Sequence, residues 1–270
     1  MAGEPPYGTP PLVLVAHGSR DPAAAATAED LAGLVRERAL RSGLDGLTVR
    51  VAYLGHAAPS PGQVLDSLPG GPVVVLPLLL THAYHSKTDI PAVLRAATAR
   101  GRGAPDIRYG EPLGPHPLLL RALERRLAQA GVPNGDPDTS VVLAAAGTSD
   151  PAARAAIREV AAGWQRRRGW REVVTAYCAS LAGETPYGGT ASPTPGAAVA
   201  ALRARAGGGR VVVASYLLAP GRFATQVAAE SLAAGADAVG GVLGAAPELA
   251  DIVLARYGAA RARVPAARIA

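Results

Sequence analysis

The feature that most constrains the fold is an internal repeat, because one order of motifs occurs twice along the chain. PLVLVAHGSRDP at 11–22 aligns with SVVLAAAGTSDP at 140–151, at an offset of 129 residues. Three further pairs follow in the same order, at offsets up to 138: PSPG at 59–62 with PTPG at 193–196, VVVLPLLL at 73–80 with VVVASYLL at 211–218, and LGPHP at 113–117 with LGAAP at 243–247. Repetition in a fixed order is typical of a duplicated structural unit, so we expect two copies of one module.

Each copy alternates apolar runs with segments of helical composition. The run 73–80 is unbroken, too short for a buried helix and typical of a central strand of a parallel sheet. Alternating strands and helices predict an α/β protein made of two tandem doubly wound parallel-sheet modules related by duplication. In the first copy we expect strands at 12–16, 47–54, 73–80 and 106–109 and helices at 23–40, 63–68, 92–99 and 118–130.

The repeat also sets the expected boundaries. Residues 132–139 are rich in Pro, Gly and Asp and have no periodicity, which is typical of a linker. We expect a disordered N-terminal lead at 1–10, a catalytic module at 11–131, a degenerate second module at 140–260 and a C-terminal tail at 261–270.

The chemistry is not duplicated, because all five histidines lie in the first half. A copied scaffold has little reason to lose every histidine if these served only packing. The first module is therefore predicted to carry the site and the second to be structural. The aligned pairs are His17 with Ala146, His85 with Phe223, and His116 with Ala246.

Two of these histidines follow predicted strands. His17 comes directly after the first strand and His85 shortly after the central one, and ligands bind at the carboxyl ends of strands in open α/β sheets. Two imidazoles across a cleft form an incomplete ligand set for a divalent first-row metal, with positions left open. Either imidazole is also suited to act as a general base.

The other histidines have weaker signals. His82, on the loop of His85, is either a third ligand or a solvated loop residue. His56 follows the second strand, and His116 lies in a Pro-rich turn where it either lines the cleft or only caps the turn. Farther along the loop, Thr88 or Asp89 is expected to cap a helix.

Several classes of function are excluded. A single cysteine, Cys178, permits no intramolecular disulfide and no Cys-rich metal site, and it is interpreted as a small buried residue. There is no Walker loop, no dinucleotide fingerprint and no Gly-x-Ser-x-Gly elbow.

Charge and hydropathy narrow the expected partners and location. The net charge of +6 suits an anionic ligand, but without a nucleic-acid-binding motif we expect no nucleic-acid partner. No apolar run approaches the length of a membrane span and no signal peptide is evident, so we expect a cytoplasmic protein with no membrane partner.

Three motifs together, AHGSRDP, PLLLTHAYHSKTDIP and LGPHP, make the chain resemble the class II tetrapyrrole chelatases, most closely the sirohydrochlorin chelatases in their fused two-module form. The resemblance implies that an octacarboxylate tetrapyrrole binds in a cleft between modules and receives Fe²⁺ or Co²⁺. It also implies that His17 and His85 hold the metal and act in catalysis. His82 stands where small residues are usual in the family, so a third ligand, an altered metal preference and no effect are all left open. The metal is then a substrate, no cofactor is tightly bound, and the protein is a monomer or a homodimer.

The same resemblance suggests residues that contact the tetrapyrrole. One departure is visible: many members have a carboxylate after the second strand, where this chain has Tyr53-Leu54-Gly55, and His56 or Glu111 is the candidate to take its place.

Two alternative functions are a nickel or other tetrapyrrole chelatase, and a carrier that binds metal or tetrapyrrole without turnover. The candidate substrate-binding residues are Ser19, Arg20, Tyr84, Glu111 and His116.

Overall fold

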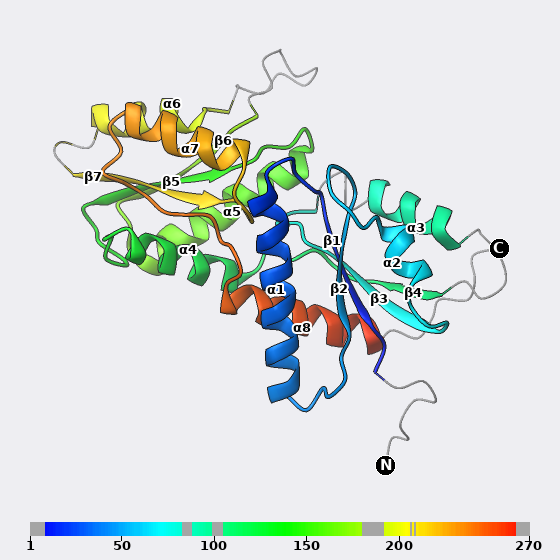
Figure 1. Ribbon diagram of the computed structural model, residues 1–270. Coiled ribbons are helices and arrows are strands. Elements are labelled where there is room, and N and C mark those ends of the chain that lie inside the picture. The colour runs from blue at the N-terminus through cyan, green and yellow to red at the C-terminus, as the bar shows by residue number, and fades with distance from the viewer. Residues whose placement is uncertain are drawn as a thin grey trace. The chain divides into compact units, whose positions relative to one another are not determined.

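The computed structural model describes residues 9–82, 88–98, 105–179, 192–205, 207 and 209–262. These residues form two four-stranded parallel sheets with helices on both faces of each (Figure 1), which confirms the predicted α/β class and the tandem modules. The elements of the first repeat are β1 (Leu12–Ala16), α1 (Pro22–Arg41), β2 (Val49–Tyr53), α2 (Pro61–Asp66), β3 (Pro72–Pro77), α3 (Ile90–Thr98), β4 (Asp106–Tyr109) and α4 (Pro117–Gln129). Those of the second are β5 (Thr139–Ala145), α5 (Pro151–Arg168), β6 (Glu172–Tyr177), α6 (Pro195–Arg205), β7 (Arg210–Tyr216), α7 (Arg222–Ala233), β8 (Ala238–Val239) and α8 (Pro247–Ala262).

The two sheets share one strand order. The first runs β2-β1-β3-β4 and the second β6-β5-β7-β8. In the first, β1 pairs in parallel with β2 and with β3, so that Leu12 lies opposite both Val49 and Val74. The first and central strands are therefore neighbours. The loops after β1, β2 and β3 therefore emerge at the same edge of the sheet.

The central strands β1 and β3 of the first sheet are buried on both faces, as their continuous apolar sequences predict. Val13 and Val15 pack in one core cluster with Ile90 and Leu94 of α3. The alternate residues of β1, including Leu14, point to the other face and are equally inaccessible. Figure 1 shows α2 and α3 together on one side of this sheet and α1 with α8 on the other.

The compact units of the structure do not coincide with the sequence repeats. One unit comprises the chain up to Gly114 together with the chain from Ala245, and the other comprises Pro115–Gly244. Helix α8, which ends the second repeat, packs on β3, β4 and α1, whereas α4, which ends the first, packs on β7. Each sheet is thus covered by the closing helix of the other repeat. The predicted helix at 118–130 exists, but it belongs to the second compact unit.

Specific contacts involve α8 and α4, the two helices that each pack on the sheet of the other repeat. A Cβ atom at Gly110, after β4, would lie 2.2 Å from Leu76 Cδ2 and 3.2 Å from Ala260 Cβ on α8, so a larger residue would force these side chains to shift. On α4, the buried Glu124 accepts hydrogen bonds from Trp164 Nε1 (2.9 Å) and Arg168 Nε (2.7 Å). These contacts tie α4 to α5 within the second unit.

Element ends differ from the expected ones by a few residues. Strand β3 ends at Pro77, and α8 continues to Ala262, into the segment expected to be a tail. Residues 1–8 of the expected lead lie outside the described residues, and the Pro10 carbonyl accepts a hydrogen bond from Tyr257 Oη (2.8 Å). None of the helices within the described ranges is long and apolar enough to cross a membrane.

Candidate functional site

The loops that follow β1 and β2 are held together at the carboxyl edge of the first sheet. The Leu54 amide donates to the Ala16 carbonyl (3.0 Å), and the Gly55 amide donates to the His17 carbonyl (3.2 Å). Gly18 has a φ of 88°, and a Cβ atom there would lie 1.7 Å from the Gly55 carbonyl oxygen. Only glycine permits this approach, which places His17 beside the end of β2.

A cavity of about 480 Å³ lies at this edge. It combines two imidazoles, one carboxylate and apolar side chains, and it lies wholly within the first compact unit. His56 has a φ of 62°, a left-handed conformation that is uncommon outside glycine and that concentrates at functional sites. The lining residues are His17, Leu54, Gly55, His56, Asp89, Ala92 and Val93.

His82 and Glu111 form a separate pair at the ends of β3 and β4. His82 Nε2 lies 3.4 Å from Glu111 Oε2, and both side chains are a little over two fifths exposed. Burial, together with the nearby Glu111 carboxylate, raises the pKa of Tyr109 to about 12. Neither His82 nor Glu111 is among the residues that line the cavity.

The two residues expected to replace the missing carboxylate at Gly55 lie in different places. Of the two residues expected to take its place, His56 faces the cavity with His17, and Glu111 is paired with His82 instead. Asp89, considered from sequence only as a helix cap, is the carboxylate that lines the cavity. Its place directly before Ile-Pro and after two histidines was the available signal.

Two of the predicted site residues, Tyr84 and His85, lie outside the described residues. Within the described ranges, no group of three or more His, Cys, Asp or Glu side chains could hold a metal ion. The metal ligand set of His17 and His85, with His82 as a third member, therefore stays a prediction.

Two other candidate residues have structural roles. The Ser19 hydroxyl accepts a hydrogen bond from the Asp21 amide (3.1 Å), as Thr148 does from Asp150 in the second unit (3.1 Å), so it organises the same turn in both copies. His116 Nδ1 accepts from the Leu118 amide (3.1 Å) and caps α4, which belongs to the second unit. Their roles in substrate binding, like that of the exposed Arg20, stay predictions.

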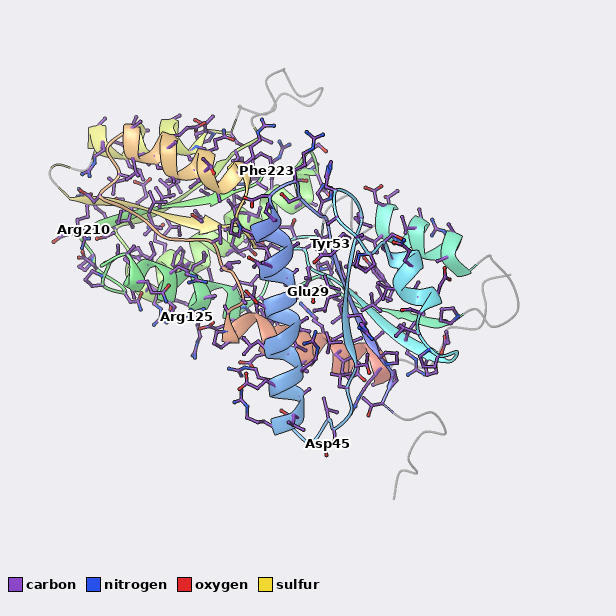
Figure 2. The ribbon with its side chains drawn as sticks, viewed as in Figure 1. Glu29, Asp45, Tyr53, Arg125, Arg210 and Phe223 are labelled. Atoms are coloured by element: carbon purple, nitrogen blue, oxygen red, sulfur yellow. The ribbon has the colours of Figure 1, made fainter. Side chains whose placement is uncertain are left out.

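Apolar side chains stand at the edge of the second sheet at the positions that align with His17 and His85. Cys178 is buried after β6, its Sγ lies 3.8 Å from the Phe223 carbonyl oxygen, and burial raises the pKa of its thiol to about 11. Phe223, labelled at the start of α7 in Figure 2, packs against the core. Ala146 stands where the first unit has His17 and also packs against this core. Cys178 is therefore a buried core residue, as predicted.

The comparisons with known proteins agree with the repeat. The CbiX family model matches twice, at residues 11–130 and 140–260. The chain is 30% identical over 172 residues to the sirohydrochlorin ferrochelatase of Priestia megaterium, an alignment that covers 63% of this chain and 62% of that protein. It is 31% identical over 159 residues to the sirohydrochlorin cobaltochelatase of the same species, covering 55% and 48%. The chain thus spans about three fifths or less of these curated relatives.

A solved structure confirms the fold over nearly the whole length. SirB from Bacillus subtilis with Fe³⁺ superposes with a TM-score of 0.75 at 22% identity, covering 94% of this chain and 96% of that one. At this identity the likeness concerns the arrangement of helices and strands in both modules.

Proposed function

The chain belongs to the CbiX family, with one copy of the family's module in each half, and from this premise we propose that it is a sirohydrochlorin chelatase that inserts Fe²⁺ or Co²⁺ into the tetrapyrrole. The observation that carries the proposal is the cavity at the carboxyl edge of the first sheet, where His17 and His56 face one space. The names of the two relatives from Priestia megaterium support the substrate and leave both metals open.

The reaction makes two demands on the protein. The incoming metal ion must be held by few ligands, so that it can pass to the four pyrrole nitrogens, and two pyrrole N–H protons must leave. Neutral imidazole is a suitable ligand for a divalent first-row metal, and a pair of imidazoles leaves positions open for the tetrapyrrole. We assign this holding role to His17, which lies in the cavity, and to His85.

No further cofactor is needed for this chemistry. The metal enters as a divalent ion and remains divalent, while the macrocycle exchanges two protons for it, so the step is neutral in electrons. The apolar side chains of Leu54 and Val93 in the cavity wall suit the face of a macrocycle. The net charge of +6 suits the carboxylates of sirohydrochlorin.

His17→Ala and His85→Ala test the assignment. Removing either ligand should lower the rate of metal insertion by about 100-fold or more, the range expected for a group at the reacting centre. Because His17 is exposed, its variant should keep a melting temperature close to that of the parent. Full activity in either variant contradicts the assignment.

The choice of metal is tested separately. Initial rates with Fe²⁺, Co²⁺ and Ni²⁺ under anaerobic conditions rank the ions, and a clear preference for Ni²⁺ would replace the proposed reaction by a nickel chelatase. A spectral change that saturates at one equivalent of protein without any gain in rate would indicate a carrier. His82→Ala, measured with each ion, shows whether His82 acts as a third ligand.

A further inference from the structure

Asp89 shares the cavity with both imidazoles. Its side chain is half-buried and lines the same space as His17 and His56. The loops after β1 and β2 supply the imidazoles, whereas the carboxylate comes from the segment that leads into α3. Three groups that can accept a proton therefore line one cavity from three separate segments of one compact unit.

The backbone at Asp89 is unusual. Thr88 and Asp89 form a π-helical turn directly before α3, a feature that is frequent at functional sites. Val74 and Val212 occupy matching positions in the two sheets, and the next fully buried helix residues are Ile90 and Val227. Between these matched buried positions the first repeat thus has one residue more than the second.

The counterpart in the second unit shows which way this position faces. If Ile90 is matched with Val227, Asp89 corresponds to Gln226. Gln226 Nε2 donates to the Cys178 carbonyl (3.2 Å), and Cys178 follows β6 as Leu54 follows β2. The position therefore faces the end of the second strand of the sheet in both units. In the second unit the side chain at this position donates to a backbone carbonyl, and in the first unit it is a carboxylate that lines the cavity.

We propose that Asp89 is a catalytic residue that accepts a pyrrole proton during metal insertion; this inference rests on the proposed function. An N–H bond of the macrocycle breaks, its electron pair stays on nitrogen and is donated to the metal, and the proton passes to the Asp89 carboxylate and then to water. The second pyrrole proton leaves by the same route once the carboxylate is free again. No electron is gained or lost by the protein.

A carboxylate can accept a proton that the two imidazoles assigned to the metal, His17 and His85, cannot. A neutral imidazole has one acceptor nitrogen, and an imidazole that holds a metal has used that nitrogen. It cannot accept a pyrrole proton while it holds the ion. An anionic carboxylate in the same cavity accepts the proton and also lowers the charge of the cavity when the divalent ion enters.

Asp89→Asn provides the test, because asparagine has nearly the same shape and serves a helix N-terminus as well as aspartate, but cannot accept the proton. We expect kcat to fall about 100-fold, with the KM for the metal changed less than about twofold. Asp89→Glu, which keeps the carboxylate, should retain a measurable part of the rate. The matched control is Asp150→Asn, an aspartate that caps α5 in the second unit by accepting from the Ala152 amide (2.9 Å), and it should turn over like the parent.

A second-site rescue separates chemistry from folding. A Cβ atom at Gly55 meets nothing within 4 Å, and Gly55 faces the same cavity. Gly55→Glu combined with Asp89→Asn should therefore recover at least about tenfold in kcat over Asp89→Asn alone, because it returns a carboxylate to the cavity.

The outcomes distinguish the two proposals. If the parent turns over and Asp89→Asn keeps its kcat within about threefold, Asp89 is not the acceptor and the chelatase proposal stands. A raised KM with an unchanged kcat likewise overturns the inference, because it assigns Asp89 to binding. A parent protein that forms no more than one equivalent of product overturns both.

Discussion

Gly18→Ala should destabilise the protein more than any ordinary loop substitution. Gly18 has a φ of 88°, and the added Cβ atom would lie 1.7 Å from the Gly55 carbonyl oxygen. That oxygen is part of the backbone and cannot rotate away. It is also held in place, because the Gly55 amide donates to the His17 carbonyl. Relief of the overlap requires the loops after β1 and β2 to separate.

The magnitude follows from two contributions. A non-glycine residue in a left-handed conformation costs about 1–2 kcal/mol. Separation of the loops breaks the hydrogen bonds of Gly55 and Leu54 to β1 and its loop, at about 1 kcal/mol each. The free energy of unfolding should therefore fall by about 3–4 kcal/mol, which for a unit of this size lowers the melting temperature by roughly 10 °C.

Calorimetry of three variants isolates the close contact. Gly43 lies in the same unit with a φ of 73° and nothing within 4 Å of its Cβ position, so Gly43→Ala should lose only the conformational part, about 1 kcal/mol. Gly55→Ala, with open space and no positive φ, should be nearly neutral. Equal melting temperatures for Gly18→Ala and Gly43→Ala would refute the reasoning.

Three other properties follow from the structure. Glu124→Gln should lower the free energy of unfolding by about 1 kcal/mol in urea titration, because the amide keeps an acceptor oxygen but loses the ion pair with Arg168, which is two fifths exposed; a loss above about 2 kcal/mol, or a gain, would contradict this. The Cys178 thiol, buried and with its pKa raised to about 11, should react with iodoacetamide at pH 7 only after denaturation, and rapid labelling of the native protein would disprove its burial. Burial raises the pKa of Tyr109 from 10.0 to about 12, so the unfolded chain loses this proton first as the pH rises. The contribution to stability is therefore complete below pH 10 and is lost between pH 10 and 12. Absorbance titration of Tyr109→Phe against the parent checks it, and a lost ionisation centred near pH 10 would contradict it.

The sequence predicts the order of strands and helices because its strands are continuous apolar runs bounded by Gly, Pro and Asp. The repeat of the GSRDP and GTSDP turns reflects a shared requirement, since both glycines, Gly18 and Gly147, have positive φ and both aspartates cap a helix. The adjacency of β1 and β3, and with it the place of His17, follows from parallel topology. These features are local or follow from general rules of sheets.

The exchange of closing helices is not predictable in the same way. Helix α4 carries an apolar face that either sheet would bury, and its choice of the second sheet depends on distant partners such as Trp164 and Arg168 on α5. The role proposed for Asp89 is not predictable from the sequence for a similar reason. Its position relative to the cavity depends on a π-helical turn, and a pattern of residue types does not encode that turn.

The central claim, that the chain is a chelatase, is tested most directly by counting product per protein molecule. The absorption spectrum of anaerobic sirohydrochlorin is followed with Co²⁺ or Fe²⁺ in excess and the protein at about one hundredth of the tetrapyrrole concentration, with the uncatalysed rate subtracted. The proposal predicts many metallated products per molecule of protein, at a rate proportional to protein concentration. A yield that stops at one equivalent, or a rate equal to that without protein, would contradict it.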